Sequence, residues 1–211
     1  MKKILTLKIF IGIIIMMASV AAVVLFLLPR SEVYKTLYKK QAADLQNGMT
    51  QFEAQLNYDG MVTQIVGKGE ITGLATYESS EVLTEQLLRL RRIYRSCRWI
   101  VGMGIVVAIA GFVCLRNQKW YECLRWASYF TVGVTHIIAL VVLLSKTLRA
   151  FVLQSQYDVM LGADPMLISI LPEQWAFYMT LVGLGILLLL GGGYILSFLG
   201  CRGLYTPHKF E

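Results

Sequence analysis

The 211-residue sequence is poor in residues that bind metals or form disulfide frameworks. It has only two histidines, and its four cysteines, at positions 97, 114, 123 and 201, show no CxxC spacing. Zinc clusters need several Cys or His ligands at short spacing, and disulfide-rich domains need cysteines in pairs. The sequence therefore predicts no metal site and no disulfide framework, and we expect no cofactor.

Charged residues are also scarce. They make up 16% of the chain, whereas 56% is hydrophobic, and the mean hydropathy is +0.60. This composition is typical of a membrane protein. The net charge of +7 would suit nucleic acid, but the basic residues flank apolar segments, where anionic lipid head groups are the nearer partner. We expect membrane lipid as a partner and no nucleic acid, and the sequence does not identify a partner protein.

Four apolar runs are candidates for membrane spans, because about twenty residues of helix cross the roughly 30 Å of hydrocarbon in a bilayer. They are residues 9–28, 99–115, 126–145 and 177–199. The second is the shortest and becomes longer if its helix begins in the preceding segment. Trp99, Trp126 and Trp175 lie at the starts of three runs, where interfacial aromatic residues are common.

The polar insertion between the first two runs is long enough to fold as a small cap. We predict an amphipathic helix over residues 31–56 that breaks near Asn47 and Gly48, a turn at 57–60, and short strands over 61–67 and 70–77. A second helix follows, capped by Ser79 or Ser80. The expected fold class is an α-helical membrane protein with four transmembrane helices and a small mixed α/β cap between helices 1 and 2.

The expected division of the chain follows from this pattern. Residues 1–28 hold the cytoplasmic N-terminus and first span, 29–98 the extracytoplasmic cap, and 99–211 the other three spans, an interfacial loop at 146–174 and a cytoplasmic tail. Outside the long insertion, eight basic residues lie on the side of the termini and two, Lys146 and Arg149, on the other. The positive-inside rule is weighted to such short segments, so we expect a multi-pass cell-membrane protein with the cap outside.

Three arginines of the second cap helix, Arg91, Arg95 and Arg98, fall on one helix face. A guanidinium group suits phosphate or carboxylate, so we predict that these side chains and Trp175 contact lipid head groups. The competing interpretation is an interfacial face that only bulk anionic lipid satisfies. His136, midway along the third span, is either a functional residue or a neutral imidazole bonded to a neighbouring helix.

The order of one span, a cap, three spans and the loop DPMLISILPEQW at 164–175 resembles the bacterial lipoprotein intramolecular transacylase family. The likeness in sequence rests on Phe151, Asp164 and the run Leu171, Pro172, Glu173 followed by an aromatic residue. It implies that this motif lies at the interface of cap and membrane. The family's enzymes move an acyl chain from the glyceryl group of a lipoprotein to the amine of its N-terminal cysteine.

The family pattern uses two histidines, and neither is present. The slot of its His-Leu-x-Asp-Val motif falls near residues 83–85, and Val152 follows Phe151 where a Phe-His motif has its histidine. Imidazole suits acyl transfer because its pKa near 7 lets it accept a proton and return it, which valine cannot do.

Three hypotheses stay open. The leading one is a protein on the transacylase scaffold that binds lipid or a lipidated protein at the cap–membrane interface without the histidine chemistry. The second is an active acyltransferase that makes lyso-form lipoproteins with other groups, of which Tyr157 and Asp158 are weak candidates. The third is a small structural subunit of a membrane complex. Whether the chain is an enzyme is left open by the sequence.

Overall fold

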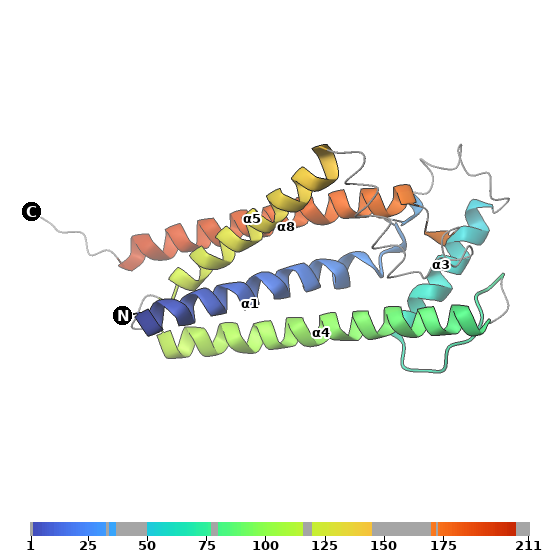
Figure 1. Cartoon of the computed structure of the whole chain (residues 1–211), viewed down its shortest axis with the longest axis horizontal. Coiled ribbons are helices and arrows are strands. Elements are labelled where there is room, and N and C mark those ends of the chain that lie inside the picture. The colour runs from blue at the N-terminus through green and yellow to red at the C-terminus, as the bar shows by residue number, and fades with distance from the viewer. Residues whose placement is uncertain are drawn as a thin grey trace, which may run out of the picture. The chain divides into compact units, whose positions relative to one another are not determined.

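The computed structural model describes residues 2–32, 34–36, 50–76, 80–115, 120–144, 170–171 and 173–205. Its long helices are α1 (Lys2–Leu27), α3 (Gln51–Val66), α4 (Glu81–Leu115), α5 (Glu122–Leu144) and α8 (Glu173–Tyr205), which Figure 1 labels. The chain divides into two compact units. We call residues 1–23, 97–140 and 184–211 the membrane unit, and residues 24–96 and 141–183 the cap unit.

Four helices are long and apolar enough to cross a membrane, as the sequence predicts. These spans are Ile4–Leu27, Glu81–Leu115, Glu122–Val141 and Phe177–Cys201. Their large side chains are often exposed, as in Phe10, Trp99 and Leu189, which is the pattern of helices whose outer faces meet lipid. The protein is therefore a multi-pass α-helical membrane protein.

The second span belongs to one continuous helix, because α4 has 35 residues without a break. At 1.5 Å per residue it is about 50 Å long, whereas the hydrocarbon layer is roughly 30 Å thick. The predicted extension of residues 99–115 into the preceding segment is thus confirmed. The predicted N-terminal capping of this helix by Ser80 is also confirmed, since the Ser80 Oγ accepts a hydrogen bond of 3.1 Å from the Leu83 backbone N–H.

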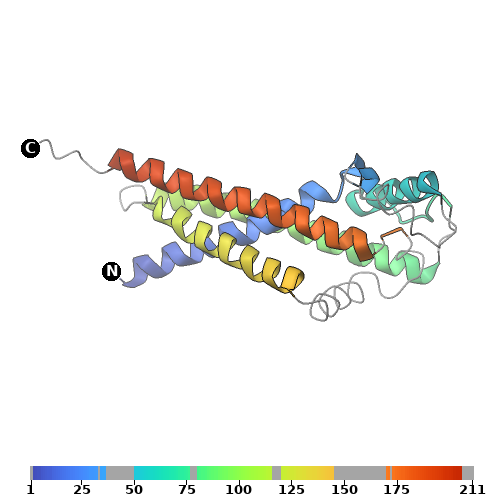
Figure 2. The ribbon, with the colours of Figure 1, turned by 90° about the horizontal axis from the view of Figure 1, so that it is seen from above.

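The helices of the membrane unit pack closely at small residues. A methyl group added at Gly12 of α1 would lie 2.6 Å from the Cβ of Trp126 on α5, and one at Gly191 of α8 would lie 2.6 Å from Val132 Cγ2. Small residues let helix backbones approach in this way. Figures 1 and 2 show α5 running beside α8 within this unit.

Polar contacts join the same helices. Lys8 Nζ of α1 and Glu122 Oε2 of α5 form an ion pair at 2.7 Å, and the hydroxyls of Ser19 and Tyr194 share a hydrogen bond of 2.6 Å between α1 and α8. The Lys8 side chain is 10% exposed, so the ion pair compensates a charge that is largely removed from water. These contacts place the start of α1 next to the start of α5.

The cap unit has an apolar core of its own, built from α3, the first half of α4 and three other segments, which follow α1, follow α3 and precede α8. Its buried members are Tyr34, Ala54, Tyr58, Met61, Ile65, Leu74, Leu83, Leu87, Tyr94, Ile170 and Leu171. Burying side chains of this size stabilises a fold by about 1.5–3 kcal/mol each.

The predicted mixed α/β cap is wrong in its strands, since no strand occurs in the part of the cap that the structure describes. Residues 57–66, predicted as a turn and a strand, belong to α3, and residues 70–76 are irregular apart from a single bridge at Leu74. The physical reason is helical spacing. Ala54, Tyr58, Met61 and Ile65 all face the core, which only an α-helix through residues 57–60 permits.

Candidate functional site

Two stacked tyrosines hold the centre of the cap unit. The rings of Tyr34 and Tyr58 are 4.0 Å apart at an interplanar angle of 9°. The Tyr34 hydroxyl donates to the Ile170 carbonyl at 2.7 Å, and the Tyr58 hydroxyl donates to the Leu28 carbonyl at 2.6 Å. The pair therefore ties the end of α1 and the segment before α8 to α3.

The segment before α8 is the part of the family-like motif that the structure places. Ile170 and Leu171 are buried in the cap core, and α8 begins at Glu173, with Trp175 in its first turn. Phe151, Tyr157, Asp158, Asp164 and Pro172 lie outside the described residues. Leu171 thus contributes to the core of the cap, and its predicted role at the membrane interface remains a prediction.

The three predicted head-group arginines do not share one environment. Arg91 is buried, and it donates from Nε to the Gln64 carbonyl at 2.8 Å and from Nη1 to the Gly69 carbonyl at 2.7 Å. Arg95 and Arg98 are exposed. The structure therefore engages Arg91 inside the cap, while lipid contact by Arg95 and Arg98 remains a prediction.

Arg91 completes the end of α3. The Gln64 carbonyl is one of the last four of that helix, which have no partner within the helix. A cation at this end also interacts favourably with the helix dipole. Arg91 therefore fastens the C-terminal end of α3 to α4.

Buried side-chain amides form a feature of the cap that the sequence analysis missed. Gln86 of α4 is 8% exposed, and its Oε1 has no hydrogen-bond partner among the described residues. The Oε1 of Gln64 is also buried without a hydrogen-bond partner among the described residues, although the Gln64 Nε2 donates to the Gly73 carbonyl at 3.1 Å. The available signal was spacing, since Gln86 follows Leu83 by three residues on the apolar face of α4.

A third amide is fully engaged. Asn57 Nδ2 donates to Thr76 Oγ1 at 2.6 Å, and Asn57 Oδ1 accepts from the Thr76 backbone N–H at 3.1 Å. This pair fixes the irregular segment after α3 against the helix. Asn57 therefore supports the cap structure, and it leaves Gln86 and Gln64 as the buried amides with a free acceptor in the described cap.

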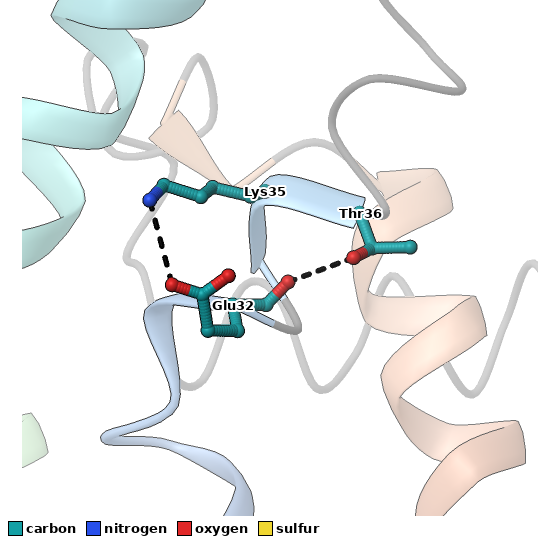
Figure 3. A network of polar contacts seen from close by, with 3 residues as sticks. All are labelled: Glu32, Lys35 and Thr36. Atoms are coloured by element: carbon teal, nitrogen blue, oxygen red, sulfur yellow. Dashed lines mark hydrogen bonds and ion pairs between the residues drawn. The ribbon is translucent and has the colours of Figure 1, made fainter.

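The cap carboxylates whose side chains the structure describes are exposed or half-buried. They are Glu32, Glu53, Asp59, Glu70, Glu81 and Glu85. Figure 3 shows one of them engaged locally: Lys35 Nζ lies 3.5 Å from Glu32 Oε1, and Thr36 Oγ1 donates to the Glu32 carbonyl at 2.9 Å. Exposed contacts of this kind contribute little to stability. None of these groups has the buried setting of a tuned acid or base.

Among the described residues of the cap, two titratable groups have shifted pKa values, and both shifts have structural causes. Hydrogen bonds from the backbone N–H and hydroxyl of Thr50 lower the pKa of the Glu53 carboxyl below its ordinary value of 4.5. Burial, together with the charge of Asp59, raises the pKa of the Tyr58 hydroxyl. Tyr58 therefore stays protonated and acts as a hydrogen-bond donor rather than as a base.

His136 is the histidine in the described part of the membrane unit. His136 lies on the exposed side of α5, and its Nδ1 donates to the Val132 carbonyl of the same helix at 2.7 Å, so its partner is not a neighbouring helix. His208 lies outside the described residues. In the part of the chain that the structure describes, no His, Cys, Asp or Glu cluster could hold a metal ion.

One small cavity lies in the membrane unit between α1, α4 and α5. Its volume is about 40 Å³, and its lining includes Ile11, Phe112, Trp120 and Cys123. Pockets that bind small molecules usually have volumes of about 300–1,000 Å³. The cavity is therefore a packing gap rather than a substrate pocket.

Comparison with known proteins supports the expected scaffold. No family model matches the sequence, and a search of curated proteins finds no match. Among solved structures, the chain is similar to the membrane integral lipoprotein intramolecular transacylase Lit from Bacillus cereus, with a TM-score of 0.77, 19% identity and 94% of each chain covered. A histidine-to-arginine variant of that protein matches with a TM-score of 0.73, 19% identity, and 94% and 90% coverage.

The likeness extends over nearly the whole of both chains, but at 19% identity it concerns the fold alone. The architecture that the resemblance implies is therefore confirmed. This chain has the fold of a membrane-integral lipoprotein transacylase.

Proposed function

We propose that this protein binds membrane lipid or a lipidated protein at the cap–membrane interface, and that it does so without the histidine chemistry of the resembled family. One observation carries the proposal. The fold is that of a lipoprotein transacylase over 94% of the chain, yet residues 29–98 and 146–174 contain no histidine. A scaffold that keeps its shape and loses its acid–base groups is suited to binding rather than to catalysis.

The chemistry of acyl transfer explains why this loss matters. The reaction needs an acceptor for the amine proton of the cysteine and a donor for the departing glyceryl oxygen, each within about 3 Å of its proton. In the described cap, the hydroxyls of Tyr34 and Tyr58 already donate to the Ile170 and Leu28 carbonyls, and the carboxylates are exposed or half-buried. Loss of one general acid–base group typically lowers a rate by a factor of about 100 to 10,000.

Gln86 supports the binding part of the proposal. Its buried Oε1 can accept a hydrogen bond from a ligand amine, amide or hydroxyl, and a buried acceptor without a partner costs about 1–3 kcal/mol. An amide oxygen does not take the proton that it binds, because its basicity is too low. Gln86 is therefore suited to hold a polar ligand group in place without reacting with it.

A lipoprotein assay tests the absence of catalysis. The protein is expressed in cells that make a diacylglyceryl reporter lipoprotein, and the N-terminal peptide of the reporter is analysed by mass spectrometry. We expect no lyso-form product above the level of cells with an empty vector. An N-acylated cysteine that carries a lyso-glyceryl group and depends on this protein would contradict the proposal, and Asp158→Asn and Tyr157→Phe would then identify the group responsible.

The same preparation tests binding. The purified protein in detergent micelles is titrated with a fluorescent diacylated lipopeptide, and Gln86→Leu is compared with Gln51→Leu, which changes an exposed glutamine of α3. Loss of one hydrogen bond predicts about a tenfold weaker complex for Gln86→Leu and no change for the control. Equal affinity for the two variants would remove Gln86 from the site, and failure of the wild-type protein to bind would refute the proposed function.

A further inference from the structure

Two neighbouring N–H groups at the start of α5 are buried without an acceptor. They are Nε of Arg125 and Nε1 of Trp126, which have no hydrogen-bond partner among the described residues. Folded proteins pair nearly all buried donors, because an unpaired one costs free energy. Two such donors on consecutive residues indicate an acceptor that is not part of the described chain.

The positive charge of Arg125 is also uncompensated. The nearest carboxylate in sequence, Glu122, is held by Lys8 at 2.7 Å, and Arg125 forms no ion pair within the described part of the chain. Instead, its guanidinium lies 5.7 Å from the centroid of the Phe198 ring of α8 and 5.9 Å from that of Trp126. These aromatic rings hold the guanidinium by cation–π interaction.

Neighbouring residues hold the Trp126 side chain in a fixed orientation. Gly12 of α1 lies against Trp126, where even a methyl group at Gly12 would come within 2.6 Å of the Trp126 Cβ. The rings of Tyr129 and Trp126 meet edge to face at 6.1 Å. Trp126 is therefore fixed from two sides, and its N–H has a defined direction.

The position along the helix indicates the ligand. Arg125 comes three residues after the start of the span Glu122–Val141, about 4.5 Å along the helix axis, which is the level of lipid head groups. Beyond it, α5 exposes large apolar side chains, among them Tyr129, Ile137 and Leu140. Arg116 and Lys119 precede α5 in the sequence and add positive charge.

We propose that Arg125 and Trp126 bind the phosphate group of an anionic phospholipid, whose acyl chains lie along the exposed apolar face of α5. A phosphate oxygen accepts from the Arg125 guanidinium, which matches phosphate geometry, and a second oxygen or the same one accepts from the Trp126 N–H. The site belongs to the membrane unit and is independent of the function proposed for the cap.

Native mass spectrometry tests the site. The full-length protein in a mild detergent is titrated with phosphatidylglycerol or phosphatidylcholine, and the bound lipid is counted. We expect tighter retention of phosphatidylglycerol by the wild-type protein, about tenfold weaker binding for Trp126→Phe, and about 10- to 100-fold weaker binding for Arg125→Gln. Trp126→Phe keeps an aromatic ring and removes the N–H, so it decides the question even if Arg125→Gln fails to fold.

Matched controls come from exposed residues of the same types. Trp99→Phe and Arg92→Gln change side chains on α4 that are exposed, and neither should alter phosphatidylglycerol retention. A competition arm with free glycerol phosphate distinguishes the source of the phosphate. Displacement of phosphatidylglycerol by millimolar glycerol phosphate would show a site for a water-soluble phosphate and overturn the lipid assignment, as would unchanged binding by Trp126→Phe.

Discussion

At the scale of single residues, Arg91 shows how far periodicity can predict a site. The spacing of Arg91, Arg95 and Arg98 correctly predicts that they share one face of α4. The spacing does not say where the cap stops covering that face. Residues 64 and 69 reach Arg91, and Arg95 and Arg98 remain exposed. Only the tertiary contact separates a structural arginine from two candidate head-group ligands.

We expect Arg91→Met to destabilise the cap. The substitution removes two charge-assisted hydrogen bonds and leaves the Gln64 and Gly69 carbonyls without their partner, a loss of about 2–3 kcal/mol in the free energy of unfolding. Thermal unfolding in detergent, followed by circular dichroism, measures the effect. Arg95→Met is the matched control, since that side chain is exposed, and equal destabilisation by the two variants would contradict the role assigned to Arg91.

Gln86 and the pair Arg125 and Trp126 could not be found from sequence for a different reason. These residues stand out because their buried polar atoms have no hydrogen-bond partner among the described residues. A missing partner can be recognised only when the neighbouring residues have been placed in space. A glutamine among leucines on a helix, or an arginine beside a tryptophan at the start of a span, is common in membrane proteins and predicts no ligand by itself.

At the scale of elements, α3 is the helix that the sequence analysis divided wrongly. Asn57 and Gly60 are turn formers, and Met61, Thr63 and Ile65 alternate as a strand would, so a turn and a strand were predicted there. The capping box of Thr50 and Glu53 gives the contrary signal: Thr50 accepts from the Glu53 N–H at 3.3 Å, and Glu53 Oε2 accepts from the Thr50 N–H at 2.8 Å. Once begun there, the helix continues because the core contacts and the Asn57–Thr76 pair favour it.

The capping box predicts an acid-sensitive start of α3. The pKa of Glu53 is lowered in the folded protein, so its stabilisation is present above the ordinary value of 4.5 and is lost as the pH falls through the folded-state pKa. We expect residues 51–54 to lose protection against hydrogen exchange at such acid pH, after correction for the intrinsic rate at each pH. Thr50→Ala should weaken the helix by about 1 kcal/mol at neutral pH.

Glu53→Gln is the matched control for this prediction. Glutamine can still accept the hydrogen bond of a capping box but does not titrate, so the variant should keep its protection at neutral pH and lose the dependence on acid. If Glu53→Gln remained as acid-sensitive as the wild-type protein, another group would have to be responsible.

At the scale of the whole molecule, the four spans were predicted well because a bilayer imposes a length and composition that a single sequence reveals. The division of the chain was less accessible. The predicted cap, residues 29–98, corresponds to residues 24–96 of the cap unit, but the structure adds residues 141–183 to the same unit. Ile170 and Leu171 join that core by a contact over more than a hundred residues, which no local pattern can indicate.

We propose that the cap faces outward and that both termini are cytoplasmic. An even number of spans places the two ends of the chain on one side, and outside the long insertion eight basic residues against two favour the cytoplasm for that side. The structure refines the choice of reporter for a test. Cys123 is 3% exposed, so it would not report its side of the membrane by chemical labelling, whereas Lys68 in the cap is exposed.

Cysteine labelling of intact cells tests this orientation. The four native cysteines are replaced by alanine, and single cysteines are introduced at Lys68 in the cap or at Gln118 in the short segment between α4 and α5. We expect Lys68→Cys to react with a membrane-impermeant maleimide in intact cells and Gln118→Cys to react only after lysis, because Arg116 and Lys119 retain that short segment in the cytoplasm. The reverse pattern would place the cap inside the cell, where a diacylglyceryl lipoprotein anchored to the outer face of the membrane could not reach it, and would leave lipid of the cytoplasmic leaflet as the ligand of the cap.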